Sequence, residues 1–327
     1  MKQITDKAIG ALTHNTPIKQ VTAKMSTLAL EIQDLEIIEA QPGKIGAEIK
    51  GLDVNELSAN SPILAKIRDL IYRNKLVVLR DQELNEEEYV AFTRKLGRPQ
   101  IYFQPQYHHP DYPEIFVSSN VSEPDGKKLG VSGTGRYWHT DCQFEPKPLS
   151  FTSIYPLVFP KSARETSYID MSLVYQNLPA ELRNMVDAEG AAFIHEAQMR
   201  YKVQASDIDR SLQELLDRFS TEVPPVKHPA VIVHPVTGIK SLYASSGFTT
   251  QFVGLNYEDN QRFMKAIFDF SERPEHVHTH FWDDGDLIIW DNRYLNHKAS
   301  TTKPGELSKS YRIGIYDDLP FYVGLEK

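Results

Sequence analysis

The chain has 327 residues, of which 41% are hydrophobic and 24% are charged. This composition is typical of a globular protein with about two average domains or one large β-rich domain. The 36 basic and 44 acidic residues give a net charge of −8, which argues against a nucleic acid as the main partner, because a phosphate backbone is bound by a clustered basic face.

Membrane insertion and disulfide bonding are also disfavoured. The longest unbroken apolar runs have about four residues, whereas a membrane-spanning helix needs roughly 20. The only cysteine, Cys142, excludes an intramolecular disulfide and a multi-cysteine zinc cluster. We therefore expect a cytoplasmic protein with no membrane segment.

The first residues differ from the rest of the chain. Residues 1–30 contain lysines and threonines but no apolar segment of the kind found in secretory signals. We expect 1–30 to be a disordered tail and 31–327 to be one domain, with an ordered arm exchanged between copies as the alternative. Homo-oligomerisation is left open.

Three helices are indicated by apolar spacing and a fourth by a capping pattern. Ile63, Ile67, Leu70 and Ile71 fall on one face of a helix. A second helix is expected to begin after Asn85, with Glu88 completing a capping box, and to end near Gly97. The other two are expected around residues 212–219 and 263–268.

Short strand-like runs occur along the whole chain without regular alternation with helices. This distribution fits a doubly wound parallel sheet poorly and favours a mainly β fold with flanking helices (α+β), a sandwich or barrel. The expected strands are 35–40, 45–50, 76–79, 115–119, 150–155, 167–170, 230–234, 240–244, 286–290 and 311–316, with a turn at 235–238.

The densest chemical motif is the segment Tyr-Trp-His-Thr-Asp at 137–141. In an extended segment, His139 and Asp141 project from the same face and can bind one metal ion. The best third ligand is His297, which follows residues 285–293, a buried strand that runs into a polar turn. Two histidines and one carboxylate, with the opposite face open, form the facial triad of non-heme Fe(II) oxygenases. A His-x-Asp pair alone also occurs by chance.

The ordered set of motifs resembles the taurine dioxygenase family of Fe(II)- and 2-oxoglutarate-dependent oxygenases. The set comprises Trp-His-Thr-Asp at 138–141, Arg-Glu-Thr at 164–166, Trp-Asp-Asn-Arg-Tyr-Leu-Asn-His at 290–297 and Tyr-Arg at 311–312. The resemblance spans about residues 35–320. It implies a double-stranded β-helix (jelly roll), Fe(2+) as cofactor, and 2-oxoglutarate and O2 as cosubstrates.

The resemblance also implies roles for individual residues. His139, Asp141 and His297 would bind the iron, and Thr166 and Arg312 would hold the distal carboxylate of 2-oxoglutarate. The need for Arg312 also follows from chemistry, because a carboxylate in a dry pocket requires a permanently charged, bidentate partner. The alternative for Arg312 is a surface ion pair, and for Thr166 a strand-forming residue without a ligand.

Two further segments resemble the isonitrile-forming branch of this family. They are Tyr-Phe-Gln-Pro-Gln-Tyr-His-His-Pro at 102–110, followed by 114–121, and Arg-Tyr-Lys-Val-Gln at 200–204. That branch converts (3R)-3-[(carboxymethyl)amino] fatty acids to 3-isocyanyl fatty acids. It carries tyrosine at the position of Phe103 and arginine at the position of Gln204, so the chain length or the N-substituent of the substrate could differ here.

An amino-diacid substrate fits the residue types in these segments. Lys202 can pair with one substrate carboxylate, and the phenols of Tyr102 and Tyr107 can donate to it. Arg164 can serve the other carboxylate or 2-oxoglutarate. The predicted substrate-binding residues are therefore Tyr102, Phe103, Tyr107, Arg164, Lys202 and Gln204.

The function predicted from the sequence is oxidation of such an amino-diacid to an isonitrile in two oxidative turnovers with decarboxylation. The alternatives are a taurine- or sulfonate-type hydroxylase, a desaturase acting on a preformed isonitrile, and a non-catalytic metal-binding jelly roll.

Overall fold

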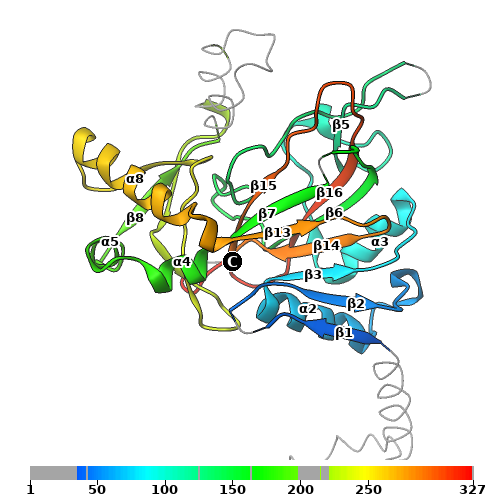
Figure 1. The fold of residues 1–327 in the computed structure, drawn as a ribbon, viewed down its shortest axis with the longest axis horizontal. Helices are drawn as coiled ribbons and strands as arrows, with labels where there is room; N and C mark the ends of the chain where they lie inside the picture. The colour runs from blue at the N-terminus through cyan, green and yellow to red at the C-terminus, as the bar shows by residue number, and fades with distance from the viewer. Residues whose placement is uncertain are drawn as a thin grey trace, which may run out of the picture.

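A computed structural model of the chain describes residues 35–41, 43–123, 126–162, 164–197, 214 and 221–325. Two β-sheets face each other, with helices on their outer sides (Figure 1). Apolar side chains from both sheets form one buried cluster between them. The prediction of a mainly β jelly roll with flanking helices is confirmed. The expected tail lies outside the described residues.

The larger sheet has eight strands in the order β1-β2-β3-β14-β6-β16-β4, and β5 also pairs with β16. Its neighbouring strands are antiparallel except for β2 and β3. The strands are β1 (Glu36–Glu39), β2 (Ala47–Lys50), β3 (Leu76–Leu79), β4 (Arg98–Pro99), β5 (Phe116–Ser119), β6 (Phe151–Val158), β14 (Leu287–Asp291) and β16 (Lys309–Tyr316).

The smaller facing sheet has the order β13-β7-β15. From β13 onward the chain alternates between the two sheets, with β14 and β16 in the larger one. The strands of the smaller sheet are β7 (Glu165–Asp170), β13 (Val277–Phe281) and β15 (Leu295–Ala299). Two minor sheets are formed by β8 (Ala192–His195), β9 (Val226–Pro229) and β12 (Thr249–Phe252), and by β10 (Val231–Val233) and β11 (Lys240–Leu242).

Helices cover the sheets on two sides (Figure 1). Two helices pack on the outer face of the larger sheet, and the others gather beside the β12-β8-β9 sheet. The first group is α2 (Pro62–Asn74) and α3 (Glu86–Leu96), and the second is α4 (Met171–Asn177), α5 (Ala180–Val186) and α8 (Tyr257–Ser271). Short 3-10 turns occupy Val54–Glu56, Pro105–Tyr107 and Pro274–His276.

The central strands of the larger sheet are apolar on both faces because both faces are covered. In β3, Val77 and Leu79 pack against the outer helices, whereas Leu76 and Val78 point between the sheets. Trp290 on β14 also points inward and is fully buried. The inward face of the larger sheet therefore forms one wall of the space that holds the predicted metal ligands.

The helix signals in the sequence were accurate where the structure describes them. Asn85 caps α3, and the reciprocal capping box with Glu88 is present. The helix expected at 212–219 lies outside the described residues except for Glu214. The sequence did not reveal α4 and α5, because each has seven residues and two turns are too short to show a period of 3.6.

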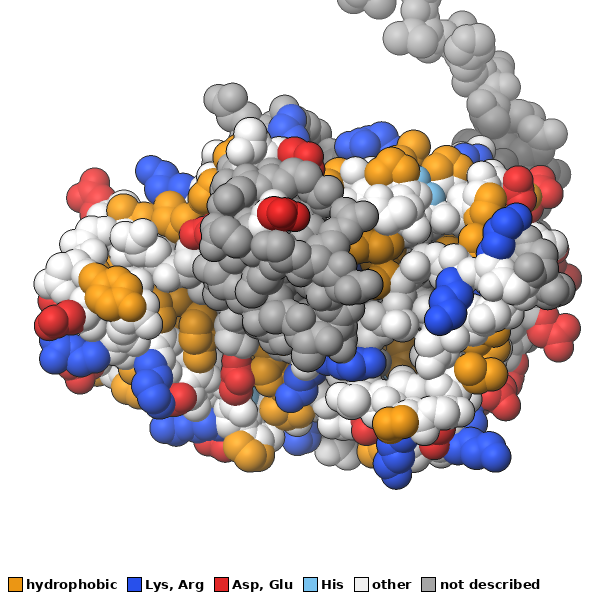
Figure 2. Space-filling model, turned by 90° about the horizontal axis from the view of Figure 1, so that it is seen from above, with side chains coloured by type: hydrophobic (Ala, Val, Ile, Leu, Met, Phe, Trp, Pro, Cys, Tyr) orange, Lys and Arg blue, Asp and Glu red, His pale blue; other side chains and the backbone are white. Residues whose placement is uncertain are grey.

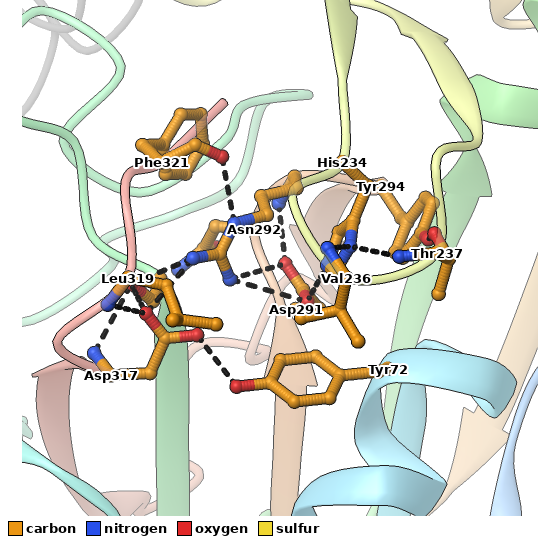
Figure 3. Close-up of polar contacts among 12 residues, drawn as sticks. Tyr72, His234, Val236, Thr237, Asp291, Asn292, Tyr294, Asp317, Leu319 and Phe321 are labelled. Atoms are coloured by element: carbon orange, nitrogen blue, oxygen red, sulfur yellow. Dashed lines mark hydrogen bonds and ion pairs between the residues drawn. The ribbon is translucent and has the colours of Figure 1, made fainter. Parts of the chain in front are cut away.

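A buried polar network fixes the corner where the chain passes from β14 to β15 (Figure 3). The guanidinium of Arg293 contacts the carboxylates of Asp291, at 3.4 Å, and Asp317, at 2.9 Å. Tyr72 on α2 donates to Asp317, and the Nε2 of His234 donates to Asp291. Each group in this water-excluded corner has a hydrogen-bonding partner, as burial of charge requires.

The surface carries charges of both signs. On the face seen in Figure 2, acidic and basic side chains are interspersed between apolar ones. In the part of the chain that the structure describes, no helix combines the length and the apolar character needed to cross a membrane.

The corner network predicts a large stability effect at one arginine. Arg293→Met leaves two buried carboxylates without their cation, and we expect the free energy of unfolding to fall by about 3–5 kcal/mol. Urea denaturation followed by circular dichroism measures this change. Arg73→Met on α2, which breaks an exposed pair with Asp69, should change the same quantity by less than about 0.5 kcal/mol. Equal effects of the two substitutions would contradict the assigned role of the network.

Candidate metal centre and its cavity

A single backbone bridge brings the two predicted histidine ligands together. His139 and His297 form an isolated antiparallel bridge, in which each amide N–H donates to the carbonyl of the other residue, at 3.1 and 2.8 Å. Residues directly opposite in such a pair project to the same face. The two imidazole rings accordingly lie with their centroids 4.1 Å apart.

The elements that carry these ligands differ in part from the prediction. His297 lies on β15, in the smaller sheet, directly beyond the polar turn that follows β14, and the sequence had not indicated this strand. Asp141 begins a turn and does not continue an extended segment. The next residue, Cys142, has a left-handed φ of 54°, which turns the chain sharply. The three side chains nevertheless converge on one point.

The donor atoms have the spacing of a metal site. The Nε2 atoms of His139 and His297 lie 3.7 and 3.9 Å from the two carboxylate oxygens of Asp141. Two donors at roughly 2.0–2.2 Å from one ion can be at most about 4.4 Å apart. Within the described residues, this is the group of histidine, cysteine and acidic side chains whose ligand atoms converge closely enough to hold a metal ion.

Hydrogen bonds from outside the triad orient two of its members, His139 and Asp141. The Nδ1 of His139 lies 2.8 Å from the carbonyl oxygen of Tyr137. This places the ring proton on Nδ1 and leaves the Nε2 lone pair for a metal. The hydroxyl of Thr152 on β6 donates to Asp141 at 2.7 Å and accepts from the side-chain amide of Asn292.

The protonation states also suit metal binding. Burial lowers the pKa of both histidines, that of His297 most strongly, so both rings are neutral near pH 7. Burial alone would raise the pKa of Asp141, but the nearby Arg312, His297 and His139 hold it well below its usual range. Neutral imidazoles and an ionised carboxylate are the forms that ligate metals.

Arg312 lies directly beside the triad. Its Nη1 donates to Asp141 at 2.6 Å, and the guanidinium packs 4.6 Å from the ring centroid of Phe116. The buried Nε–H of Arg312 has no hydrogen-bond partner among the described atoms. An unsatisfied buried donor is costly unless a ligand accepts from it, so the arginine has bonding capacity left for an anion.

Thr166 lies on the opposite wall, on β7 of the smaller sheet. Its hydroxyl oxygen accepts a hydrogen bond from the indole N–H of Trp282, at 2.9 Å. The hydroxyl proton of Thr166 thus remains available to a ligand. Arg312 on β16 and Thr166 on β7 face one cavity of about 280 Å³, which the triad also lines.

The predicted substrate residues are only partly brought together. Tyr102, Tyr107 and Arg164 line this cavity. Phe103 is not one of its lining residues; it packs on the rings of Tyr102 and Phe144 and is 37% exposed. Lys202 and Gln204 lie outside the described residues, so their predicted roles stay predictions.

Sequence reasoning missed several residues around the site. Thr152 is one of many strand threonines, and no pattern indicated its bond to Asp141. Trp282 and the backbone carbonyl of Tyr137 likewise gave no signal. Asn292 lies inside the Trp-Asp-Asn-Arg motif, which could have suggested its proximity to the site.

Comparison with known proteins shows which enzymes this chain is similar to. The family model described as "Taurine catabolism dioxygenase TauD, TfdA family" matches residues 37–312. The chain is 26% identical to pentalenolactone F synthase of Streptomyces arenae over 300 residues, which are 87% of this chain and 96% of that protein. It is 27% identical to an alpha-ketoglutarate-dependent sulfate ester dioxygenase of Pseudomonas putida over 259 residues, covering 79% and 81% of the two chains.

A solved structure has the same fold. The structure of a taurine dioxygenase from Burkholderia xenovorans superposes with a TM-score of 0.69 and 26% sequence identity, over 89% of this chain and 94% of the other.

The geometry predicts that each triad residue is needed for metal binding. His139→Ala and Asp141→Ala should each weaken Mn(II) binding by more than about 100-fold, since even residues that only orient ligands contribute 10–100-fold. Isothermal titration of the purified protein with Mn(II) measures this change. His278→Ala, a histidine of β13 outside the triad, serves as the control and should bind Mn(II) like the parent. If the triad variants also bind like the parent, the metal centre lies elsewhere.

Proposed function

The chain belongs to the TauD/TfdA family of Fe(II)- and 2-oxoglutarate-dependent dioxygenases, and from this premise we propose that it oxidises a (3R)-3-[(carboxymethyl)amino] fatty acid to a 3-isocyanyl fatty acid. The observation that carries the proposal is the mixed character of the cavity beside the triad. Aromatic side chains and arginines line the same space. A substrate with an apolar chain and two carboxylates matches both.

The aromatic part of the wall supports the apolar chain. Phe116, Phe144 and Phe248 line the cavity and belong to one buried cluster together with Tyr102 and Tyr137. Such a wall offers a fatty chain contact area without hydrogen-bonding groups that would remain unpaired. A small zwitterion such as taurine would leave most of it uncovered.

His139, Asp141 and His297 would hold the metal through two imidazole nitrogens and one carboxylate. When bound, ferrous iron and 2-oxoglutarate together activate dioxygen and supply the oxidising equivalents for the reaction. Thr152 and the carbonyl of Tyr137 fix the orientation of Asp141 and His139. Trp290, whose ring lies 4.6 Å from that of His297, excludes water from the inner side of the site.

Thr166 and Arg312 would hold the distal carboxylate of 2-oxoglutarate. The hydroxyl of Thr166 can donate to it from the smaller sheet, and the Nε–H of Arg312 from the larger one. In this structure Arg312 also contacts Asp141, so the guanidinium would be shared between the two carboxylates or would move from one to the other. The cosubstrate would thus span the space between the sheets.

The substrate would lie on the side of Tyr102 and Tyr107, whose rings stack 6.4 Å apart. Their phenols, with Lys202 and Gln204, would bind one substrate carboxylate. Arg164 lies two residues before Thr166 and contacts Asp284 at 2.8 Å; we propose it for the other carboxylate or for 2-oxoglutarate. Phe103 would shape the pocket from behind Tyr102.

The proposed conversion balances over two turnovers. Each turnover consumes one 2-oxoglutarate and one O2 and releases succinate and CO2. The first converts the N–CH2 group to a hydroxylated carbon, which loses water to give an imine. The second removes the remaining hydrogens and the carboxyl group as CO2 and water. The sum is loss of four hydrogens and one CO2 from the substrate, with formation of the isonitrile and two waters.

A second candidate is a hydroxylase of alkyl sulfonates or sulfate esters. The similarity to a sulfate ester dioxygenase favours it, and an alkyl sulfate also combines an apolar chain with an anion. A desaturase of preformed isonitriles and a non-catalytic metal-binding protein are the remaining alternatives. The family membership and the proposed carboxylate-binding pair, Thr166 and Arg312, argue against a non-catalytic metal-binding protein.

Stoichiometry separates the two candidates. If the proposal holds, incubation with Fe(II), 2-oxoglutarate and a (3R)-3-[(carboxymethyl)amino] fatty acid yields two succinates per isonitrile, because two oxidations are needed. Mass spectrometry of the products with quantitation of succinate measures this ratio. A boiled-enzyme sample is the control. A ratio of one, with a hydroxylated product, would instead show simple hydroxylation.

The role of Arg312 gives a second test. Arg312→Leu should raise the KM for 2-oxoglutarate by about two orders of magnitude or more, because loss of one partner of a buried charge pair typically costs about 3–5 kcal/mol. Mn(II) binding should persist, since the three ligands remain. Arg262→Leu on the exposed face of α8 is the matched control. An unchanged KM for 2-oxoglutarate in Arg312→Leu would remove this residue from the cosubstrate site.

A further inference from the structure

A second, polar cavity adjoins the central one at its mouth. Its lining comes from two loops and from one further residue, and it comprises Ser132, Gly133, Arg136, residues 302–305, Ser308 and Asn120. The two cavities share Ser132, Gly133, Arg136, Thr302 and Ser308. Arg136 therefore lies where the central cavity meets the second cavity, which we call the outer cavity.

Hydrogen bonds anchor both walls where the two cavities meet, one wall to strands β5 and β15 and the other to Asn120, the residue after β5. Thr134 contacts the hydroxyl of Ser118 on β5, and the amide of Ala299 on β15 donates to the carbonyl of Gly135 at 2.7 Å. On the other wall, Asn120 makes two side-chain hydrogen bonds, to the carbonyl of Glu306 and from the amide of Ser308, each 2.8 Å long. The backbone that carries Arg136 is thus fixed relative to the triad.

Gly133 creates room for the Arg136 side chain. The glycine has a φ of 71°, and a β-carbon at this position would lie 2.6–2.7 Å from the guanidinium. The side chain of Arg136 therefore lies flat against the glycine backbone. Any other residue at 133 would displace the guanidinium and would also strain the left-handed backbone.

We propose that Arg136 and the polar outer cavity form a subsite for an anionic group of the substrate, a carboxylate or a chemically similar oxyanion. The planar guanidinium is the side chain best suited to bind such a group through two hydrogen bonds. Of the three arginines that line the central cavity, Arg312 contacts Asp141, and Arg164 contacts Asp284 and precedes Thr166 by two residues. Arg136 is the one that borders both cavities.

This inference rests on the proposed function only in taking the central cavity as the place of reaction. It adds that the anion lies toward the outer cavity, so the reacting carbon lies between this anion and the metal ligands. For the proposed amino-diacid, Arg136 would bind the carboxylate that is retained in the product, because the carboxylate to be lost must lie close to the metal centre.

The test uses the full chain loaded with Mn(II) and 2-oxoglutarate under anaerobic conditions. Isothermal titration measures the binding of 3-[(carboxymethyl)amino]decanoic acid, decanesulfonate and decyl sulfate, each compared with a counterpart in which neutral groups replace the anionic ones (the diamide, the sulfonamide and decanol). We expect at least one anion to bind, and Arg136→Gln to weaken it by 10-fold or more without changing the affinity for the neutral counterpart or for 2-oxoglutarate.

Two further variants separate the effect of the position of the Arg136 guanidinium from the effect of removing a positive charge nearby. Gly133→Ala should also weaken anion binding, by displacing the guanidinium. Its matched control is Gly190→Ala, where φ is 75° and no atom lies near the added carbon. Lys128→Gln removes a cation four residues before Ser132, at a position that lines neither cavity, and it should bind the probes like the parent.

The outcomes are distinct. The subsite is overturned if Arg136→Gln binds every anion within twofold of the parent, if only neutral probes bind, or if the affinity for 2-oxoglutarate falls as much as that for the probe. If a sulfonate or sulfate binds in an Arg136-dependent way while the amino-diacid does not bind, the subsite stands and the isonitrile-forming function fails.

Discussion

The two hydrogen bonds between His139 and His297 are the constraint on which the site depends. They join an irregular segment to one edge of β15, and they fix which residue of that segment lies opposite His297. A shift by one residue would turn one imidazole to the other face of the pair. Because Asp141 follows two residues later, its carboxylate is positioned by the same bridge. The open side of the triad then faces the cavity between the sheets.

Two of the buried charge networks differ in how completely their hydrogen-bonding groups are paired. At the β14–β15 corner, Arg293 compensates two carboxylates and ties helix α2 and the chain end to the strand that leads toward His297. In the cavity, Arg312 compensates Asp141 but keeps an unused donor. The first network is saturated and stabilises the fold. The second is incomplete, as expected of a site that receives an anionic ligand and a cation.

The strands and the loops around the cavity contribute different functional groups to its wall. The two sheets contribute His297, Thr166 and Arg312, which lie on regular strands and are therefore held in place by many backbone hydrogen bonds, whereas His139 and Asp141 come from the irregular segment that is bridged to β15. The loops before His139 and after β15 contribute the glycines, the hydroxyls and Arg136. Loops on a rigid scaffold vary more easily than strands.

The sequence by itself determined the types of the groups and much of the secondary structure. The capping residues of α3, the apolar runs of β3 and β14 and the ordered motifs around His139, His297 and Arg312 depend on local patterns, which are readable without contacts. The sequence also indicated the jelly roll, through its resemblance to a family. It did not indicate β15, however, because this five-residue strand carries polar residues at its centre and lacks an alternating pattern.

Tertiary structure alone decided which groups meet. The pairing of His139 with His297 joins residues 158 positions apart, as the numbering in the sequence shows. The bond from Thr152 to Asp141, the contact of Arg312 with the same carboxylate and the space that Gly133 leaves for Arg136 likewise depend on the register of strands and on backbone conformation. No local pattern records them, because a side chain's neighbours across a sheet are set by how the whole chain pairs, and the chemistry of this site arises from those neighbours.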